Sequence, residues 1–184
     1  MSFITTNYQN NKEQQSFEPL PSAEYEMIIK SAMENATPSG AETLQITLVV
    51  RNDLDNAMPE SNGKHHNRYV FNDNWKRKAT KQYDVDSFQY ILQAVGVPEG
   101  TQINSVDDFI NVITGKPVRV YVKKAIDKYQ TEKKGTEVYT NEVAPWNYHK
   151  SQFPAVQHQW KDGDKPISTQ PNDTIEITDE DVPF

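Results

Sequence analysis

The sequence predicts a mainly β protein: a five-stranded barrel with a helical insert between strands 3 and 4, followed by a disordered acidic tail. Three observations lead to this prediction. Apolar and polar residues alternate in several short segments, which is typical of half-buried strands. Two further segments carry apolar residues at helical spacing and end at glycine and proline. From about residue 151 the periodicity fades, and Pro, Asp, Ser and Thr become frequent.

The first two strands are expected at residues 25–30 and 44–50, where apolar side chains occupy every second position. Ser39 and Gly40 mark a turn between them. The two segments therefore predict an antiparallel hairpin. A polar loop follows, and a short third strand is expected at residues 68–71.

The helical insert comes next in the chain. Asp86 is positioned to cap a helix that ends near Val95, and Ser105 to cap a second helix that ends at Ile113. Glycine and proline follow both segments and stop them.

Two more strands complete the predicted barrel. Residues 118–123 alternate with period two over their whole length, and residues 137–148 follow a basic turn that ends at Gly135. Three strands, a helical insert and two strands is the order of the oligonucleotide-binding (OB) fold. We therefore predict a five-stranded OB-type barrel.

The chain divides into three predicted parts. Residues 1–16 are rich in Asn, Gln, Thr and Ser and are expected to form a flexible arm. Residues 17–150 hold the barrel, and residues 151–184 the disordered acidic tail. No internal repeat is visible, so one barrel per chain is expected.

Composition excludes several classes of protein. The chain has no cysteine, which excludes a disulfide scaffold, a cysteine nucleophile and a zinc site with cysteine ligands. No apolar run approaches the ~20 residues that cross a bilayer, and residues 1–14 lack the apolar stretch of a signal peptide. We expect a protein of the host-cell cytoplasm with no membrane partner.

Charge is segregated along the sequence. The net charge is −7, but residues 162–184 carry seven acids against Lys165, so the rest of the chain sums to only −1. Residues 64–81 and residues 116–134 are basic islands, each with a local charge of +5. Such asymmetry indicates an electrostatic role, although solvated basic loops would give the same pattern.

The predicted strand at 118–123 carries a candidate binding pattern. If its valines face the core, Arg119, Tyr121 and Lys123 share the outer face. A ring that stacks on a base and cations that follow phosphates suit an unpaired strand of nucleic acid. The alternative is an edge strand whose lysine discourages aggregation.

Aromatic and basic residues are also interleaved in the first basic island and, more sparsely, on the last strand. Stacking combined with counterion release requires this mixture, although any single ring is also a candidate for the core. The candidate DNA-binding residues from all these segments are Arg68, Tyr69, Phe71, Trp75, Lys76, Arg77, Lys78, Arg119, Tyr121, Lys123, Tyr139 and Trp146.

The last six residues form a second candidate site, for a partner protein. They are Asp179, Glu180, Asp181, Val182, Pro183 and Phe184. This acidic run, ending in Pro-Phe and a free carboxylate, resembles the tip of bacterial single-stranded-DNA-binding proteins. The resemblance implies that the terminal ring enters a pocket on a partner while the acids meet basic residues around it. The alternative is an ordinary acidic tail.

Several segments of the body resemble a family of small phage proteins that are described as single-stranded-DNA-binding. The resemblance spans roughly residues 1–148 and the final six residues, and it implies a role beside phage replication and recombination genes. It is carried by Phe17-Glu18-Pro19-Leu20-Pro21, Glu24-Tyr25-Glu26, Ser39-Gly40-Ala41-Glu42, Leu48-Val49-Val50-Arg51-Asn52-Asp53, Trp75-Lys76-Arg77-Lys78-Ala79-Thr80 and Gly96-Val97-Pro98-Glu99-Gly100.

No catalytic set is visible in the sequence. The phosphate-binding, zinc-protease and serine-hydrolase motifs are absent. Asp53 and Asp55 form a loose pair that a magnesium nuclease could use, but turn chemistry explains it better. The four histidines lack metal-ligand spacing and are expected in exposed loops. We therefore expect no enzyme activity and no cofactor.

These observations favour a protein that binds single-stranded DNA without sequence preference and recruits replication or recombination proteins through its tip. Self-association of the chain is compatible with the sequence. The principal alternative is an interaction protein, or DNA mimic, whose acidic tail blocks a host factor.

Overall fold

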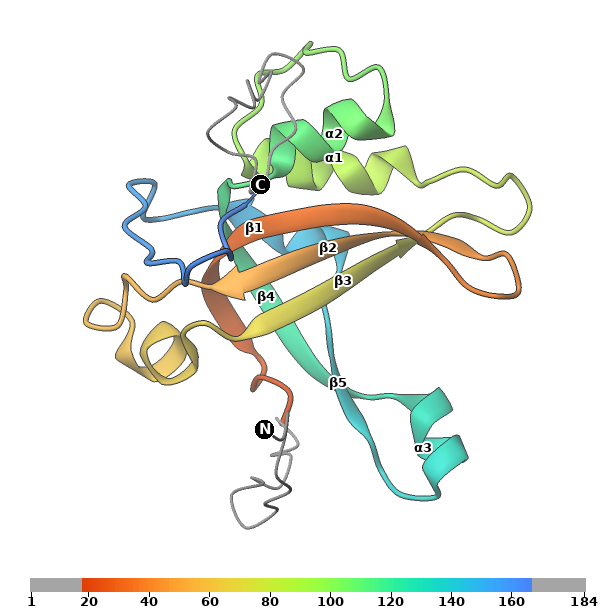
Figure 1. Cartoon of the computed structure of the whole chain (residues 1–184), viewed down its shortest axis with the longest axis horizontal. Coiled ribbons are helices and arrows are strands. Elements are labelled where there is room, and N and C mark those ends of the chain that lie inside the picture. Colours follow the sequence, from red (N-terminus) through yellow and green to blue (C-terminus); the bar gives the residue numbers. More distant parts are fainter. Residues whose placement is uncertain (1–17, 167–184) are drawn as a thin grey trace, which may run out of the picture.

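The computed structural model describes residues 18–166 and shows a mainly β domain built on one six-stranded antiparallel sheet (Figure 1). The strand order is β3-β2-β1-β4-β5, and β6 also pairs with β4. The strands are β1 (Ala23–Ala36), β2 (Glu42–Val50), β3 (Tyr69–Trp75), β4 (Pro117–Ile126), β5 (Tyr139–Glu142) and β6 (Tyr148–Lys150). Within the described residues no backbone ladder joins the end strands β3 and β5, so the sheet is open between them.

Short helices connect the strands. They are α1 (Val85–Ala94), α2 (Val106–Ile113), α3 (Lys128–Lys134), the π-helix η1 (Pro59–Gly63) and the 3-10 turn η2 (Pro145–Asn147). In Figure 1, α1 and α2 lie together at one end of the sheet, and α3 lies at the tip of the projecting β4–β5 hairpin. No helix between residues 18 and 166 is long and apolar enough to span a membrane.

The long strand β1 links the two halves of the sheet. Its first half pairs with β4 and its second half with β2, and Met27 and Ile28 pair with both neighbours. A register shift between Ile29 and Ser31 bends the strand. The bend lets one sheet curl around a single core.

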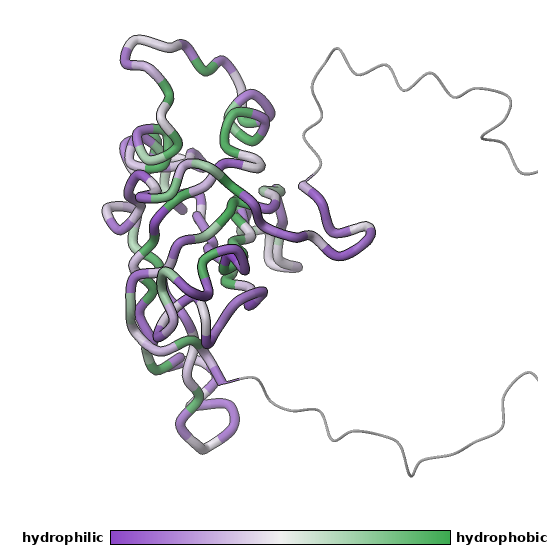
Figure 2. Tube along the Cα trace, turned by 90° about the vertical axis from the view of Figure 1, so that its left-hand side faces the viewer, coloured by the Kyte–Doolittle hydropathy of each residue, from purple (hydrophilic) through white to green (hydrophobic). Residues whose placement is uncertain are grey.

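The core is made by inward-facing residues of the strands and by one face of each of α1 and α2. Val118, Val120 and Val122 are fully buried, as the alternation of β4 predicts. Phe88 of α1 stacks on Phe109 of α2 with ring centroids 4.5 Å apart. Figure 2 shows hydrophobic stretches running through strands and helices, with mostly hydrophilic loops outside.

Local predictions of helix ends are partly confirmed. The Ser105 side chain accepts a hydrogen bond from the Asp108 N–H at 3.0 Å and caps α2. The prediction that Asp86 caps α1 is wrong, because Asp84 is the N-cap residue and Asp86 lies in the first turn. The predicted basic turn before Gly135 contains α3, which ends at that glycine with φ of 72°.

The predicted fifth strand is divided in two. Residues 139–142 form β5 and residues 148–150 form β6, with η2 between them. Pro145 begins η2 and has no N–H for a sheet ladder, so the strand is interrupted there. The sheet therefore has six strands instead of five.

The prediction that a disordered tail begins at residue 151 is also wrong in its boundary. Residues 151–160, which we call the strap, lie against the start of β1 and the end of β2. The fully buried Arg51 forms a bidentate ion pair with Asp53, at 2.9 and 2.6 Å, and donates to the carbonyls of Phe153 and Ala155. A buried guanidinium needs all these acceptors, and the strap supplies two of them.

A buried carboxylate on β1, that of Glu26, also binds the strap. The Glu26 carboxylate accepts hydrogen bonds from the Ser151 hydroxyl and from the Gln152 N–H at 2.9 Å. The Asn62 side chain bonds to the backbone of Glu26 and of Arg51. The ordered domain consequently extends beyond residue 150.

Candidate nucleic-acid interface

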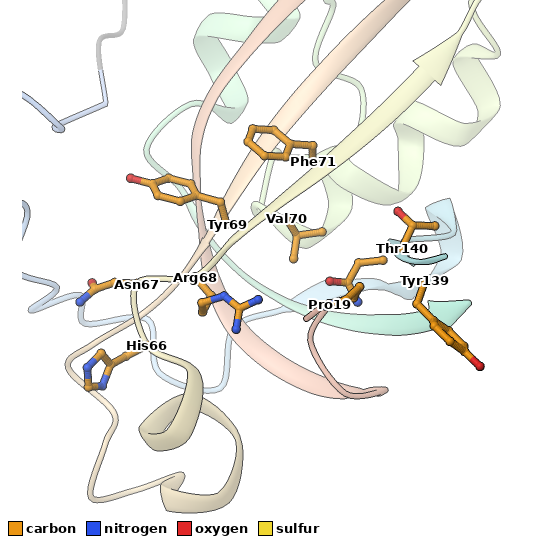
Figure 3. Close-up of a pocket in the computed structure, with 10 residues that line it drawn as sticks. Pro19, His66, Asn67, Arg68, Tyr69, Val70, Phe71, Tyr139 and Thr140 are labelled. Carbon is orange, nitrogen blue, oxygen red and sulfur yellow. The ribbon is translucent and has the colours of Figure 1, made fainter. Parts of the chain in front are cut away.

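The clearest exposed aromatic residues lie on β3. Val70 and Asn72 point toward the core, so Tyr69, Phe71 and Trp75 point outward, and they are 40%, 56% and 49% exposed. Tyr69 and Phe71 are nearly parallel, with an interplanar angle of 13° and ring centroids 6.4 Å apart. Figure 3 shows both rings on the same side of β3, with Val70 on the other side.

Small β-branched neighbours on β2 leave these rings accessible. In the register, Val49 lies opposite Tyr69, Thr47 opposite Phe71 and Thr43 opposite Trp75. None of the three is large enough to cover a ring on the adjacent strand. The outer side of β3 is thus an open platform.

β1 adds a cation and an apolar side chain to the same side of the sheet. The Lys30 ammonium lies 5.0 Å from the Tyr69 ring centroid and 3.3 Å from its hydroxyl. Met33 is 54% exposed and lies opposite Gln45, which in turn lies opposite Asp73. We call this surface the aromatic face; its residues are Lys30, Met33, Tyr69, Phe71 and Trp75.

The aromatic face is not uniformly cationic. Asp73 lies between Phe71 and Trp75 on the outer side of β3 and accepts a hydrogen bond from Gln45 at 3.1 Å. Lys30 is bonded to Asp164 at 3.4 Å as well as to Tyr69. Burial lowers the pKa of Lys30, but the contacts with Tyr69 and Asp164 outweigh it and raise the pKa overall, so this amine stays charged.

A groove of about 640 Å³ adjoins the aromatic face, between β3 and β5 (Figure 3). Its walls include Tyr69 and Phe71 on one side and Tyr139 and Thr140 on the other, and Pro19 also lines it. Arg68 lies at the same groove and donates to the Glu18 carbonyl.

The predicted residues of β4 do not join the aromatic face. Arg119, Tyr121 and Lys123 point outward, as expected, but β1 and β2 separate β4 from β3. Since β3 and β4 direct their inner residues into one core, their outer residues diverge. Arg119 is half-buried and lies 3.7 Å from Glu24.

Two of the three basic residues that follow Trp75 form ion pairs within the protein. Lys76 lies on the opposite side from Trp75, forms an ion pair with Glu42 and lies 5.0 Å from the Tyr83 ring centroid. Arg77 forms an ion pair with Asp84 at 3.1 Å, and Lys78 is exposed. Lys76 is therefore not part of the aromatic face.

The two remaining predicted rings are not part of the aromatic face, although Tyr139 lines the far wall of the groove beside it. Tyr139 is exposed on the β4–β5 hairpin, beneath the Lys124 ammonium at 5.0 Å from its ring centroid. Trp146 is 64% exposed on η2, which packs against α1.

Sequence reasoning missed Lys30 and Trp160. Trp160 belongs to the strap and lines a small pocket together with Tyr69. Its ring packs edge-on against His158 at 4.4 Å. The buried His158 accepts the Asn52 N–H at Nδ1, at 3.0 Å, so the expectation that it is an exposed loop histidine is wrong.

The candidate magnesium pair has other roles. Asp53 binds Arg51, and Asp55 contacts His66 at 3.0 Å. Burial raises the pKa of Asp53, but hydrogen bonds from Arg51 and the Gln157 N–H outweigh it and lower the pKa overall. Among residues 18–166 no cluster of His, Cys, Asp or Glu could hold a metal ion.

The predicted arm (residues 1–16) and partner-binding tip (residues 179–184) lie outside the described residues. Residues 6–166 match the family described as "Protein of unknown function (DUF669)". No curated protein matches the sequence. The family match covers most of the chain, which therefore belongs to the DUF669 family.

Proposed function

We propose that the protein binds single-stranded DNA without sequence preference through the aromatic face. The observation that carries this proposal is the row of exposed rings on β3 with the Lys30 ammonium beside Tyr69. Large aromatic rings are usually stabilised by burial in the hydrophobic core, yet these rings lie on the surface. Each ring that stacks on a base contributes roughly 1–3 kcal/mol, and stacking accepts any base.

The arrangement of the strands supports an OB-type barrel with an open seam between β3 and β5. β1 pairs with both β2 and β4 in the sheet. In the sequence, α1 and α2 lie between β3 and β4. The Asn72 side chain of β3 donates to the Val143 carbonyl just after β5 at 3.2 Å and so bridges the seam. OB-type barrels bind oligonucleotides on the outer side of strands 2 and 3, and the rings of the aromatic face lie on the outer side of β3.

The proposed function includes a role in phage DNA replication or recombination. The resemblance to phage single-stranded-DNA-binding proteins supports a function in coating DNA during phage replication or recombination, in the host-cell cytoplasm and without catalysis. The acidic tip that ends at Phe184 would then recruit a replication or recombination protein. Its ring provides apolar area, and its acids direct it to a basic surface.

A binding experiment with fluorescent oligo-dT and duplex DNA at two salt concentrations tests the proposal. We expect the protein to prefer oligo-dT and to bind more weakly as salt rises. Replacing both Tyr69 and Phe71 by alanine should weaken binding at least about tenfold. Tyr90→Ala, which removes a similarly exposed ring from α1, is the matched control and should bind as the unmodified protein does.

Absence of oligo-dT binding at low salt would refute this function and favour the acidic interaction protein. If the Tyr69→Ala/Phe71→Ala variant and the Tyr90→Ala variant lost the same affinity for oligo-dT, the DNA would bind elsewhere on the surface.

A further inference from the structure

The seam between β3 and β5 exposes two strand edges to each other. Both are end strands of the sheet, and among residues 18–166 no ladder joins them. Unpaired strand edges are templates for the addition of another strand. The hydrogen bonds within the sheet determine which backbone groups of each edge point into the seam.

On β3, the hydrogen bonds to β2 show which residues have backbone groups that point away from β2 and into the seam. The Val50 N–H donates to the Arg68 carbonyl and the Lys76 N–H to the Glu42 carbonyl, each at 2.9 Å. Even-numbered residues of β3 therefore bond to β2, because hydrogen-bonded positions alternate in an antiparallel pair. The backbone N–H and C=O groups of Tyr69 and Phe71 point into the seam.

On β5, the hydrogen bonds to β4 likewise show which backbone groups point into the seam. The Asp127 N–H donates to the Val138 carbonyl at 2.7 Å, in register with the β4–β5 ladder. Positions 140 and 142 bond to β4 in consequence. The backbone groups of Tyr139 and Asn141 point into the seam opposite Tyr69 and Phe71.

The seam is wide at one end and closed at the other. Asn72 bridges it to the Val143 carbonyl, whereas the groove of about 640 Å³ opens it beside Tyr69 and Tyr139. β3 and β5 run in the same direction, because each is an even number of antiparallel steps from β1. A strand that runs opposite to both could bond to both edges.

The start of the described chain lies at this groove. The Glu18 carbonyl accepts a hydrogen bond from Arg68, Pro19 lines the groove, and the Leu20 N–H and C=O bond to the Asn141 side chain. Seventeen residues precede Glu18, and the family match begins among them, at residue 6. Any segment of this arm is thus tethered beside the seam.

One segment of the arm has the composition of a strand. Residues 3–8 read Phe-Ile-Thr-Thr-Asn-Tyr, in which five of six residues are β-branched or aromatic. Residues 9–17 are long enough to reverse the chain direction before Glu18. A tether this short gives an effective concentration in the millimolar range, which favours the arm of the same chain over another copy.

We propose that residues 3–8 dock in the seam of their own chain as an added strand, antiparallel to both β3 and β5. The added strand pairs with the backbone groups of Tyr69, Phe71, Tyr139 and Asn141. It lies next to the aromatic face and leaves the outward rings in place.

Amide hydrogen exchange on the full chain tests this docking. The double variant Ile4→Pro/Thr6→Pro removes two donors from the segment, so the amides of Tyr69, Phe71 and Tyr139 should exchange at least tenfold faster than in the unmodified protein. Gln14→Pro, in the linking segment, is the matched control and should leave these rates unchanged. Equal rates in all three proteins would overturn the proposal.

Cysteine cross-linking provides a second readout, since the chain has no native cysteine. Thr5→Cys should form an intramolecular disulfide with Thr140→Cys, on β5, at least tenfold faster than with Thr101→Cys, in the loop between α1 and α2. Equal rates, or disulfides only between chains, would overturn docking within one chain. Oligo-dT binding is measured separately and should be unchanged in the double-proline variant, so failure of the proposed function would not affect this result.

Discussion

The outer surfaces of β3 and β4 share one sequence pattern but have different surroundings. Each strand alternates buried residues with outward residues that include aromatic rings; β4 adds the basic residues Arg119 and Lys123, whereas β3 carries no basic residue. On β3 the outward rings are exposed and have small neighbours on β2. On β4, Arg119 lies opposite Glu26 on β1 and beside Glu24, and Glu26 itself holds the strap.

This difference shows that alternation identifies the outward residues of a strand but not what covers them. Arg119 was a candidate phosphate contact, yet its Nε is buried and has no hydrogen-bond partner among the described residues. Glu24 of β1 lies beside Arg119, whereas Lys123 on the same side of β4 is exposed. On the β3 side the outward rings are exposed, whereas the Tyr121 ring of β4 is half-buried.

The largest expected effect concerns the strap. Arg51→Met should lower the free energy of unfolding by about 3–5 kcal/mol, because it leaves Asp53 and two strap carbonyls without their buried partner. Urea denaturation measures the change. Arg77→Met, which breaks an exposed ion pair with Asp84, should cost less than about 1 kcal/mol. A similar loss in both variants would contradict the structural role of the strap.

The next effect compares the two outer surfaces directly. Phe71→Ala should weaken oligo-dT binding by roughly 1–3 kcal/mol, whereas Tyr121→Ala should change it by less than about twofold. Fluorescence anisotropy at one fixed salt concentration measures both variants. If Tyr121→Ala caused the greater loss, β4 and not β3 would hold the platform.

A smaller effect is the acid sensitivity of the strap. Burial lowers the pKa of His158 in the folded protein; nearby Asp53 opposes this shift and Arg51 adds to it. The unfolded chain, with an ordinary histidine pKa of about 6.5, therefore takes up the proton first as pH falls. Stability should be complete above about pH 6.5, decline as pH falls from there to the lower folded pKa, and level off below it.

Urea denaturation between pH 8 and pH 5 measures this decline. His158→Gln cannot titrate in this range and should show a shallower decline than the unmodified protein. Identical pH profiles would show that another group is responsible.

Local patterns predicted the parts of the fold that depend on nearby residues. Val118, Val120 and Val122 are buried as alternation required, and the Ser105 cap needs only the adjacent helical turn. The side on which Lys76 lies was not predicted, because the sequence placed the end of β3 at residue 71. Once the strand continues to Trp75, the next residue turns to the opposite side.

Contacts between distant parts of the chain account for what the sequence could not predict. Arg51 meets Phe153, and Lys30 meets Tyr69, through the curl of the sheet and the return of the strap. No pattern within a short segment contains these pairings. The strand order, which separates β4 from β3, cannot be predicted from alternation, and it places the candidate DNA-binding residues of these two strands on different parts of the surface.

The smallest expected effect separates the two lysines nearest to the rings. Lys30 lies on the aromatic face beside Tyr69, whereas Lys76 lies on the other side of the sheet with Glu42. If Lys30 contacts one phosphate, Lys30→Met should reduce the slope of log affinity against log salt by about 0.7, and Lys76→Met should leave it unchanged. Titrations of oligo-dT from 50 to 300 mM salt measure both slopes. A reduced slope in the Lys76 variant alone would mean that DNA binds beside Lys76 and Tyr83, beyond the end of β3 and away from the exposed rings.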